Sequence, residues 1–294
     1  MKAPVGYRKI YLLLAAFLFP VYAAAHEFWI EPLRFVVPTG DRVVANLNVG
    51  KYFKGNVQPF IQEKFVEFSV TDSSGKRSVS GRPGDLPALD VPVLHPGLQV
   101  LAYQSRPQSA VYEDFAKFER FAQKEGNLWI IDEHKRRGLP RRKITEAYTR
   151  FAKSLVQAGD TRGADEIVGF PLELLVETNP YTMPAGGDVT VRLLWQGEGL
   201  PFAQISVFQK SAGCEATLSA VQTDESGLAL VSYNGGGRFL LNAVHVILPT
   251  PETLRDIRAD WESLWASLTF ELPKAMEPGE ESTECPPSTD GQVK

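Results

Sequence analysis

The sequence predicts a mainly β fold, with two Ig-like β-sandwich domains and an α-helical insertion between them. Short runs rich in β-branched and aromatic residues, separated by Pro, Gly, Asp and Ser, occupy both ends of the chain after residue 25. Between them, apolar residues recur at the three- and four-residue spacing of helices. The predicted segments are a signal peptide at 1–25, a first sandwich at 26–106, the helical insertion at 107–169, a second sandwich at 170–273 and a disordered tail at 274–294.

The first 25 residues have the features of a secretory signal peptide. Basic residues precede an apolar run at 10–19, and the small residues Ala23 and Ala25 follow it. The run is shorter than the roughly 20 residues that a membrane-spanning helix needs. We therefore expect cleavage after Ala25, a periplasmic location and no membrane span after processing.

The net charge argues against a nucleic-acid partner, and the cysteine content allows at most one intramolecular disulfide. Cleavage would remove Lys2, Arg8 and Lys9 and no acidic residue, so the formal net charge would move from −4 to −7. Nucleic acid is therefore not expected as a partner. Cys214 and Cys285 are the only cysteines, and export allows them either to form one disulfide or to remain two separate thiols.

The first sandwich is predicted from four runs with the composition of strands, at 28–35, 42–49, 65–70 and 98–105. A Thr-Asp-Ser-Ser-Gly-Lys turn follows the third run. His95 stands before Pro96 and reads as a loop residue, which makes it a reserve metal ligand.

The helical insertion is predicted from a change of period after residue 108. Apolar residues at helical spacing form two sets, which are Val111, Phe115, Phe118 and Ala122, and then Ile144, Ala147, Phe151 and Leu155. A short further helix at 128–135 would carry His134, the second reserve ligand, and a basic run follows it. Such a run most simply forms a solvated face.

The second sandwich is predicted from strands that begin at Leu172. They continue at 188–195, 201–209, 229–233, 238–248 and 264–272, with glycine-containing turns between several of them. His245 lies inside the fifth of these strands among apolar neighbours, so its ring needs a partner there. A hydrogen bond to the backbone and a metal ion both remain possible partners.

The predicted site depends on His26. Cleavage after Ala25 would make His26 the first residue, and an α-amino group titrates near pH ~7.7–8.0, so it gives up its proton to a metal ion readily. Amine and imidazole together form a chelate, and a third nitrogen would complete a histidine brace, which suits copper or nickel. We predict that His245 supplies that nitrogen at the junction of the two domains, so that His26 and His245 share one metal ion.

Several separate motifs, in order, resemble the DUF4198 family over nearly the whole mature chain. They are HEFWIEP at 26–32, Glu125-Gly126, YTRFAKSL at 148–155, Pro171-Leu172-Glu173, Asn179-Pro180-Tyr181, TDESG at 223–227, Ala243-Val244-His245 and WESLWASLTF at 261–270. The resemblance implies an exported bacterial protein of uncharacterised biochemistry, related to periplasmic parts of nickel and cobalt uptake systems. It also implies that the mature sequence begins at His26. The Val-His pair near the end of family sequences corresponds to Val244-His245. Unlike those uptake components, this sequence has no predicted transmembrane segment.

The function expected from these observations is binding of a transition-metal ion (nickel, cobalt or copper) for uptake or delivery in the periplasm, without catalysis. An envelope metal transporter or receptor would be its partner. One alternative is a metal-free envelope interaction or glycan-binding module. Another is a copper-dependent oxidative enzyme that uses the N-terminal histidine, with Trp29, Trp261 and Trp265 as sugar-stacking residues. No hydrolytic constellation or phosphate loop stands out in the sequence.

Overall fold

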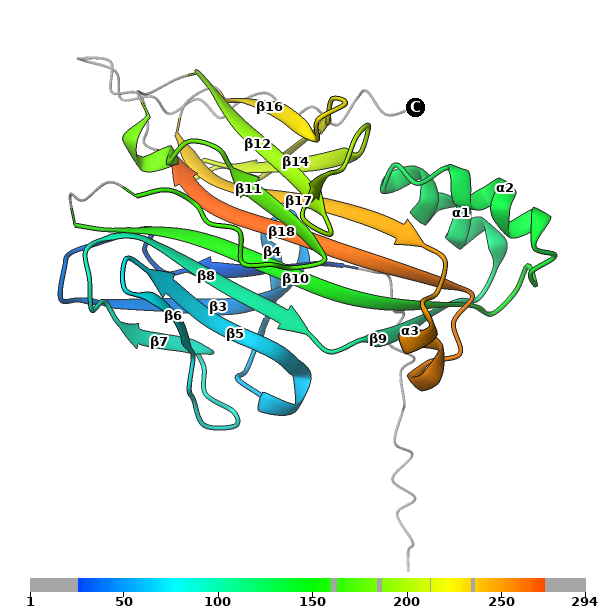
Figure 1. Cartoon of the computed structure of the whole chain (residues 1–294), viewed down its shortest axis with the longest axis horizontal. Coiled ribbons are helices and arrows are strands. Elements are labelled where there is room, and N and C mark those ends of the chain that lie inside the picture. Colours follow the sequence, from blue (N-terminus) through cyan, green and yellow to red (C-terminus); the bar gives the residue numbers. More distant parts are fainter. Residues whose placement is uncertain (1–25, 160–162, 184–186, 212, 234–235, 273–294) are drawn as a thin grey trace, which may run out of the picture.

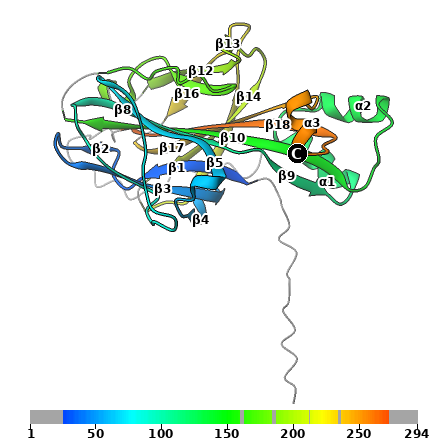
Figure 2. The same ribbon diagram turned by 60° about the horizontal axis from the view of Figure 1, so that its bottom comes forward.

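The computed structural model describes residues 26–159, 163–183, 187–211, 213–233 and 236–272. These residues form three layers, with one large central sheet between two smaller sheets (Figures 1 and 2). The mainly β class predicted from the sequence is confirmed. The predicted signal peptide at 1–25 and tail at 274–294 lie outside the described residues.

The central sheet has ten strands in the described part of the chain, and eight of them follow the order β15-β14-β17-β18-β10-β8-β5-β6. Strand β10 pairs in parallel with β18 along one edge and antiparallel with β8 along the other, and β2 and β9 also pair with it. The strands are β2 (Val36–Val37), β5 (Phe65–Asp72), β6 (Gly75–Ser78), β8 (Gly97–Ser105), β9 (Gln108–Tyr112), β10 (Ile144–Ala158), β14 (Gln204–Lys210), β15 (Thr217–Gln222), β17 (Gly237–Ile247) and β18 (Trp261–Leu272).

One face of the central sheet, here called the first face, is covered by the sheet that contains the start of the described chain. That sheet consists of β1 (Glu27–Pro32), β3 (Arg42–Lys51), β4 (Lys54–Gln58) and β7 (Leu89–Pro92). Helices α1 (Phe115–Lys124) and α2 (Trp129–Arg136) cover a further part of the same face, where they pack on Val244, Val246, Trp261 and Trp265.

The second face is covered by the other small sheet. It consists of β11 (Leu172–Val176), β12 (Gly187–Trp195), β13 (Glu198–Gly199) and β16 (Leu228–Tyr233). Short helices lie in the connections, namely η1 (Gln62–Lys64), η2 (Pro180–Thr182) and α3 (Pro251–Asp256). Because successive side chains of a strand point to opposite faces, each central strand contributes to two cores. Phe151 and Leu155 belong to the second-face core, whereas Ala152 and Val156 belong to the first.

The two sandwiches are therefore not separate units, because both use the same central sheet. The predicted helical insertion is also not confirmed, since β9 and β10 are central strands. Helices α1 and α2 agree with the prediction, and Asp114 caps α1 by accepting a hydrogen bond from the Lys117 amide at 2.9 Å.

The second predicted long helix was wrong, since Ile144–Ala158 forms β10. This strand is buried on both faces, so apolar residues occur on both and produce helix-like intervals by chance. Within the described ranges, the helices are too short or too polar to cross a membrane.

Candidate functional site

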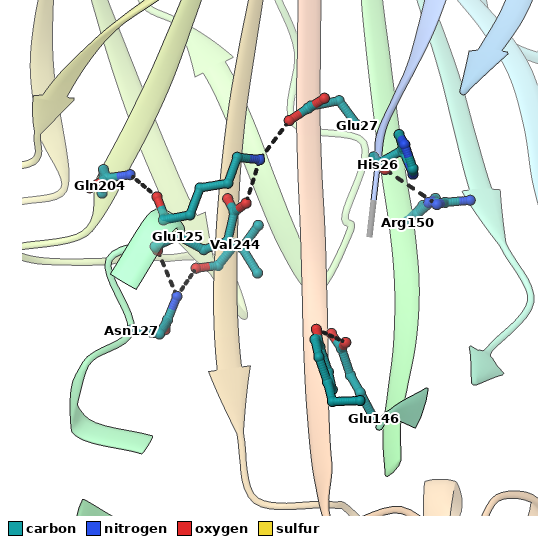
Figure 3. A network of polar contacts seen from close by, with 10 residues as sticks. His26, Glu27, Glu125, Asn127, Glu146, Arg150, Gln204 and Val244 are labelled. Carbon is teal, nitrogen blue, oxygen red and sulfur yellow. Dashed lines mark hydrogen bonds and ion pairs between the residues drawn. The ribbon is translucent and has the colours of Figure 1, made fainter. Parts of the chain in front are cut away.

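His26 lies immediately before β1, at the end of that strand nearest to helix α1 (Figure 3). It is half-buried, and its main-chain carbonyl accepts a hydrogen bond from the Arg150 guanidinium at 3.3 Å. Strand β1 is fixed on the first face, where the Thr269 hydroxyl donates to the Ile30 carbonyl at 2.6 Å. The position of His26 is therefore set by β1, which it precedes, and by Arg150 of β10.

Arg150 comes from β10 and lies in an aromatic environment. Its guanidinium carbon is 5.6 Å from the centre of the Phe28 ring and 4.9 Å from that of Tyr148. Burial lowers the pKa of Arg150, but an arginine remains charged at any physiological pH. A fixed positive charge therefore lies next to the first described residue.

A hollow of about 1060 Å³ opens beside His26. Two segments besides His26 line it, the hairpin between β3 and β4 and the connection between β14 and β15; the lining residues are Val49 to Lys51, Tyr52, Lys54 to Asn56 and Gly213 to Thr217. Lys54 and Glu215 form an ion pair between these segments. Cys214, on the same wall, is disulfide-bonded.

The hairpin wall contains a strained turn. Tyr52 and Phe53 have φ of 52° and 56°, values that aromatic residues rarely adopt. Phe53 is buried and packs edge-on against Trp29 at 6.0 Å between centroids, which compensates the strain. A side chain at Gly50 would collide with the Lys54 carbonyl, so the close hairpin requires glycine there. One wall of the hollow is thus a close, glycine-dependent hairpin.

Buried charges lie on the other side of His26. Lys124, from the end of α1, contacts Glu27 and Glu125 at 2.8 Å each, and both carboxyl groups are buried (Figure 3). Burial by itself lowers the pKa of Lys124, but the two carboxylates outweigh it and raise that pKa above its usual value. Burial raises the pKa of Glu125. The Oε2 atom of Glu27 has no hydrogen-bond partner among the described residues.

Glu146 is a third carboxyl group on this face and is fully buried. The Tyr112 hydroxyl donates to it at 2.6 Å, and so does the Ser263 hydroxyl, which in turn accepts from the Trp265 indole at 2.8 Å. Burial raises the pKa of Glu146, and the hydrogen bonds from Ser263 and Tyr112 only partly oppose this effect. The native state therefore holds a proton on Glu146 more tightly than the unfolded chain does.

This difference predicts a pH dependence of stability. The contribution of Glu146 is fully present below its ordinary pKa of 4.5 and is lost as pH rises towards the folded-state pKa. Because glutamine cannot ionise, Glu146→Gln should gain stability relative to the wild type by roughly 1.4 kcal/mol per pH unit over that interval. Urea unfolding of both proteins at increasing pH measures the difference.

Glu133→Gln is the matched control for this experiment. A hydrogen bond from Arg136 lowers the pKa of Glu133, so that group should cause no loss of stability above its ordinary pKa of 4.5. A stability difference between wild type and Glu146→Gln that stays constant with pH would contradict the raised pKa.

His245 lies on the opposite face of the central sheet from His26. In the antiparallel pair of β17 and β18, His245 is opposite Leu264, which belongs to the second-face core. The His245 ring packs against Trp195 with 4.6 Å between centroids, and burial lowers its pKa. Its Nε2 has no hydrogen-bond partner within the described ranges. The structure therefore does not bring His26 and His245 together, and the predicted shared site is not found.

The two reserve histidines are also away from His26. His134 is buried between helices and sheet, where its Nδ1 accepts from the Trp261 indole at 3.0 Å and its Nε2 is 3.1 Å from the Pro140 carbonyl. His95 is exposed in the loop before β8. The part of the chain that the structure describes contains no cluster of three or more His, Cys, Asp or Glu residues suited to a metal ion.

Several residues around His26 were missed by sequence reasoning. The family motifs include the segments of Glu27, Glu125 and Arg150, but no pattern assigned these residues a role. The β3–β4 hairpin carries a run of glycine, lysine and aromatic residues at 50–55 that could have marked an unusual turn.

Comparisons with known proteins give one family. A family model described as a domain of unknown function (DUF4198) matches residues 23–247. The curated proteins contain no match to the chain. Among solved structures, a tetra-tandem repeat in the extending region of a large adhesion protein matches with a TM-score of 0.19 and 14% identity. That match covers 83% of this chain, which spans 49% of the repeat structure.

Proposed function

Since the chain belongs to the DUF4198 family, whose function is unknown, we propose from the geometry at His26 that it is a periplasmic carrier of a transition-metal ion. The single observation that carries the proposal is the place of His26, half-buried before β1 and at the edge of the hollow. Nickel, cobalt or copper would be cargo for uptake or delivery, and the carrier would not catalyse a reaction.

The chemistry follows from one residue with two nitrogen donors. After cleavage behind Ala25, the α-amine and the imidazole of His26 would chelate a metal ion, and nitrogen ligands favour copper, nickel and cobalt over magnesium or calcium. Among the described residues, His95, His134 and His245 all lie elsewhere, so a complete histidine brace is not part of the proposal. A site with two protein nitrogens leaves coordination positions open, which suits a cargo that must be released to a transporter or receptor.

Arg150 and the buried carboxyl groups support this arrangement in different ways. Arg150 holds the His26 carbonyl and so fixes the backbone next to the amine. Its positive charge disfavours a cation nearby, and Glu27 and Glu125, which share the Lys124 ammonium, offset that effect only in part. His26 is therefore positioned by Arg150, which is itself held in the paired strand β10.

The copper-dependent oxidative enzyme is less well supported by the geometry. Trp29, Trp261 and Trp265 are buried, so they are not available to stack on a sugar. The metal-free interaction module is the second candidate, and the hollow favours it, because Lys51, Lys54 and Asn56 line a polar surface suited to an anionic or hydroxylated ligand.

Metal titration of the processed protein tests the proposal. Three proteins should be compared by calorimetry with copper, nickel and cobalt: the chain that begins at His26, the same chain with Ala25 retained in front of it, and His26→Ala. Loss of an outer-shell partner alone typically lowers metal affinity by about 10–100-fold. We expect the second and third proteins to lose at least as much.

The protein with Ala25 retained is the informative control, because it keeps the imidazole and moves the terminal amine from His26 to Ala25, so that amine and imidazole no longer belong to one residue. Equal affinities of all three proteins would place any metal elsewhere. Absence of binding to the first protein would refute the carrier function and leave the metal-free module.

A further inference from the structure

Arg150 carries a positive charge that no carboxylate in the described part of the chain pairs with. Its side chain is half-buried on β10, and within the described ranges its guanidinium makes one hydrogen bond, from Nη2 to the His26 carbonyl. That bond is 3.3 Å long, which exceeds the usual range of about 2.7–3.2 Å. Most N–H donors of this guanidinium therefore have no acceptor among the described residues.

Arg238 of β17 shows the arrangement that a partly buried arginine usually has. It also lies over an aromatic ring, that of Phe35 at 5.8 Å, but it pairs with the Glu31 carboxylate at 3.1 Å. Taking a charged group out of water costs free energy unless an opposite charge and hydrogen bonds replace the water. Arg150 has the aromatic contacts without the carboxylate.

The surroundings of Arg150 fix the orientation of its side chain. The guanidinium lies near the rings of both Phe28 and Tyr148, and the Tyr148 hydroxyl is itself held by a hydrogen bond to Gln108 at 3.0 Å. A guanidinium is planar and presents its N–H groups as a fork that matches the two oxygens of a carboxylate. Arg150 is therefore pre-organised to bind a carboxylate.

Arg150 is also within reach of a metal ion at His26 (Figure 3). The amine nitrogen and the carbonyl oxygen of one residue are at most about 3.6 Å apart, so Nη2 of Arg150 lies within about 7 Å of the His26 amine nitrogen. A carboxylate can place one oxygen about 2.1 Å from a metal ion and the other about 2.8 Å from a guanidinium nitrogen. Such a bridge would span the distance between the two groups.

The balance of charge around His26 favours a ligand of this kind. Glu27 and Glu125 both pair with Lys124, so together they leave at most one negative charge to offset Arg150. A divalent metal ion would add two positive charges to this half-buried place, where charges repel more strongly than in water. An anion that is bound to the metal ion would remove that repulsion.

We propose that the cargo at His26 is a metal–carboxylate complex, and that Arg150 binds the carboxylate. This inference rests on the proposed carrier function and names its substrate class. The amine and imidazole of His26 would hold the metal ion, and a small organic acid would fill the coordination positions that they leave open. Arg150 would donate hydrogen bonds to a carboxylate oxygen of that acid.

Calorimetric titration with nickel tests the proposal, with malonate as the probe for the organic acid. The chain that begins at His26, Arg150→Gln and Arg150→Lys are each titrated with and without malonate at equal ionic strength, so that nickel and malonate combine equally in solution in every case. Without malonate, Arg150→Gln should bind nickel as tightly as the wild type or more tightly, because it loses a nearby positive charge.

With malonate the order should reverse. Both variants should bind nickel at least about tenfold more weakly than the wild type, equivalent to about 1.4 kcal/mol. Arg150→Lys keeps the charge but loses the planar fork, so it should behave like the wild type only without malonate. It also keeps the comparison possible if Arg150→Gln does not fold, which thermal unfolding would show.

Lys54→Gln is the matched control. It also removes one positive charge beside His26, but from an exposed residue whose partner is Glu215. The effect of malonate on nickel binding should be the same in this variant as in the wild type. An equal loss in Lys54→Gln and Arg150→Gln would mean that malonate responds only to the overall charge, and would overturn the proposal.

The remaining outcomes separate this inference from the carrier function. If the Arg150 variants lose the same affinity with and without malonate, Arg150 only positions His26, and the metal–carboxylate cargo is wrong while the carrier function stands. The same conclusion follows if malonate acts equally on the wild type and both Arg150 variants. Absence of nickel binding by the wild type in both buffers would refute the carrier function and this inference with it.

Discussion

Replacement of Lys153 by alanine is expected to destabilise the protein by roughly 3–5 kcal/mol, because it leaves two buried carboxyl groups without their cation. The Lys153 ammonium contacts Asp165 at 2.8 Å and Glu173 at 3.0 Å, and it donates to the Glu166 carbonyl at 2.9 Å. The three charged side chains are at most 1% exposed.

The cluster also fixes the connection between β10 and β11. Glu173 accepts hydrogen bonds from the amides of Val168, Gly169 and Phe170 at 2.9–3.1 Å, and Asp165 accepts one from the Val176 amide at 2.9 Å. Loss of the ammonium would therefore disturb both the charges and the backbone that they hold.

Urea unfolding at neutral pH measures the effect. Lys135→Ala is the matched control, since its ion pair with Asp132 is exposed on both sides and such pairs contribute about 0–1 kcal/mol. Burial raises the pKa of Asp165 even in the wild type, so protonation should relieve part of the Lys153→Ala defect at lower pH. A loss no larger than that of the control would show that the cluster is not stabilising.

Replacement of Trp261 by alanine is expected to cost roughly 3–5 kcal/mol, the usual range for truncating a buried aromatic residue. Trp261 has no exposed surface and stacks on Phe118 with 6.0 Å between centroids. Its indole donates to His134 Nδ1 at 3.0 Å, which fixes the tautomer with the proton on Nε2. The substitution would open a cavity between the helices and β18 and leave a buried polar atom unpaired.

Two further variants separate these contributions. Trp261→Phe keeps most of the packing but loses the indole donor, so it should cost about 1–3 kcal/mol. Trp129 packs edge-on against Trp261 but is 47% exposed, so Trp129→Ala should cost less than Trp261→Ala. Thermal or urea unfolding gives all three values, and equal losses for Trp129→Ala and Trp261→Ala would contradict the role of burial.

The local elements were largely predictable from the sequence, because their signals are local. The predicted strands at 42–49, 65–70 and 98–105 correspond to β3, β5 and β8, and helix α1 has its apolar residues on one side. Half-buried strands and surface helices show these periods directly. Strand β10 does not, because its two faces are both apolar, and its pattern was misread as helical.

For the candidate site too, the sequence indicated one residue, whereas the packing of the sheets decided which residues lie near it. The sequence alone singled out His26, since a predicted cleavage site and a histidine are adjacent in the chain. Whether His245 approaches it depends on which layer covers each side of β17, and alternation gives two sides without saying what packs on either. Pairing with β18 put His245 on the second face.

The sequence by itself thus determined the β class and the positions of most strands, and it drew attention to the histidine next to the predicted cleavage site. Only the tertiary structure decided that two sandwiches share one sheet, that Arg150, Glu27 and Lys124 gather near His26, and that His245 does not. The physical reason is that strand order and layer packing depend on contacts between residues far apart in the chain. Local periodicity contains no information about such partners.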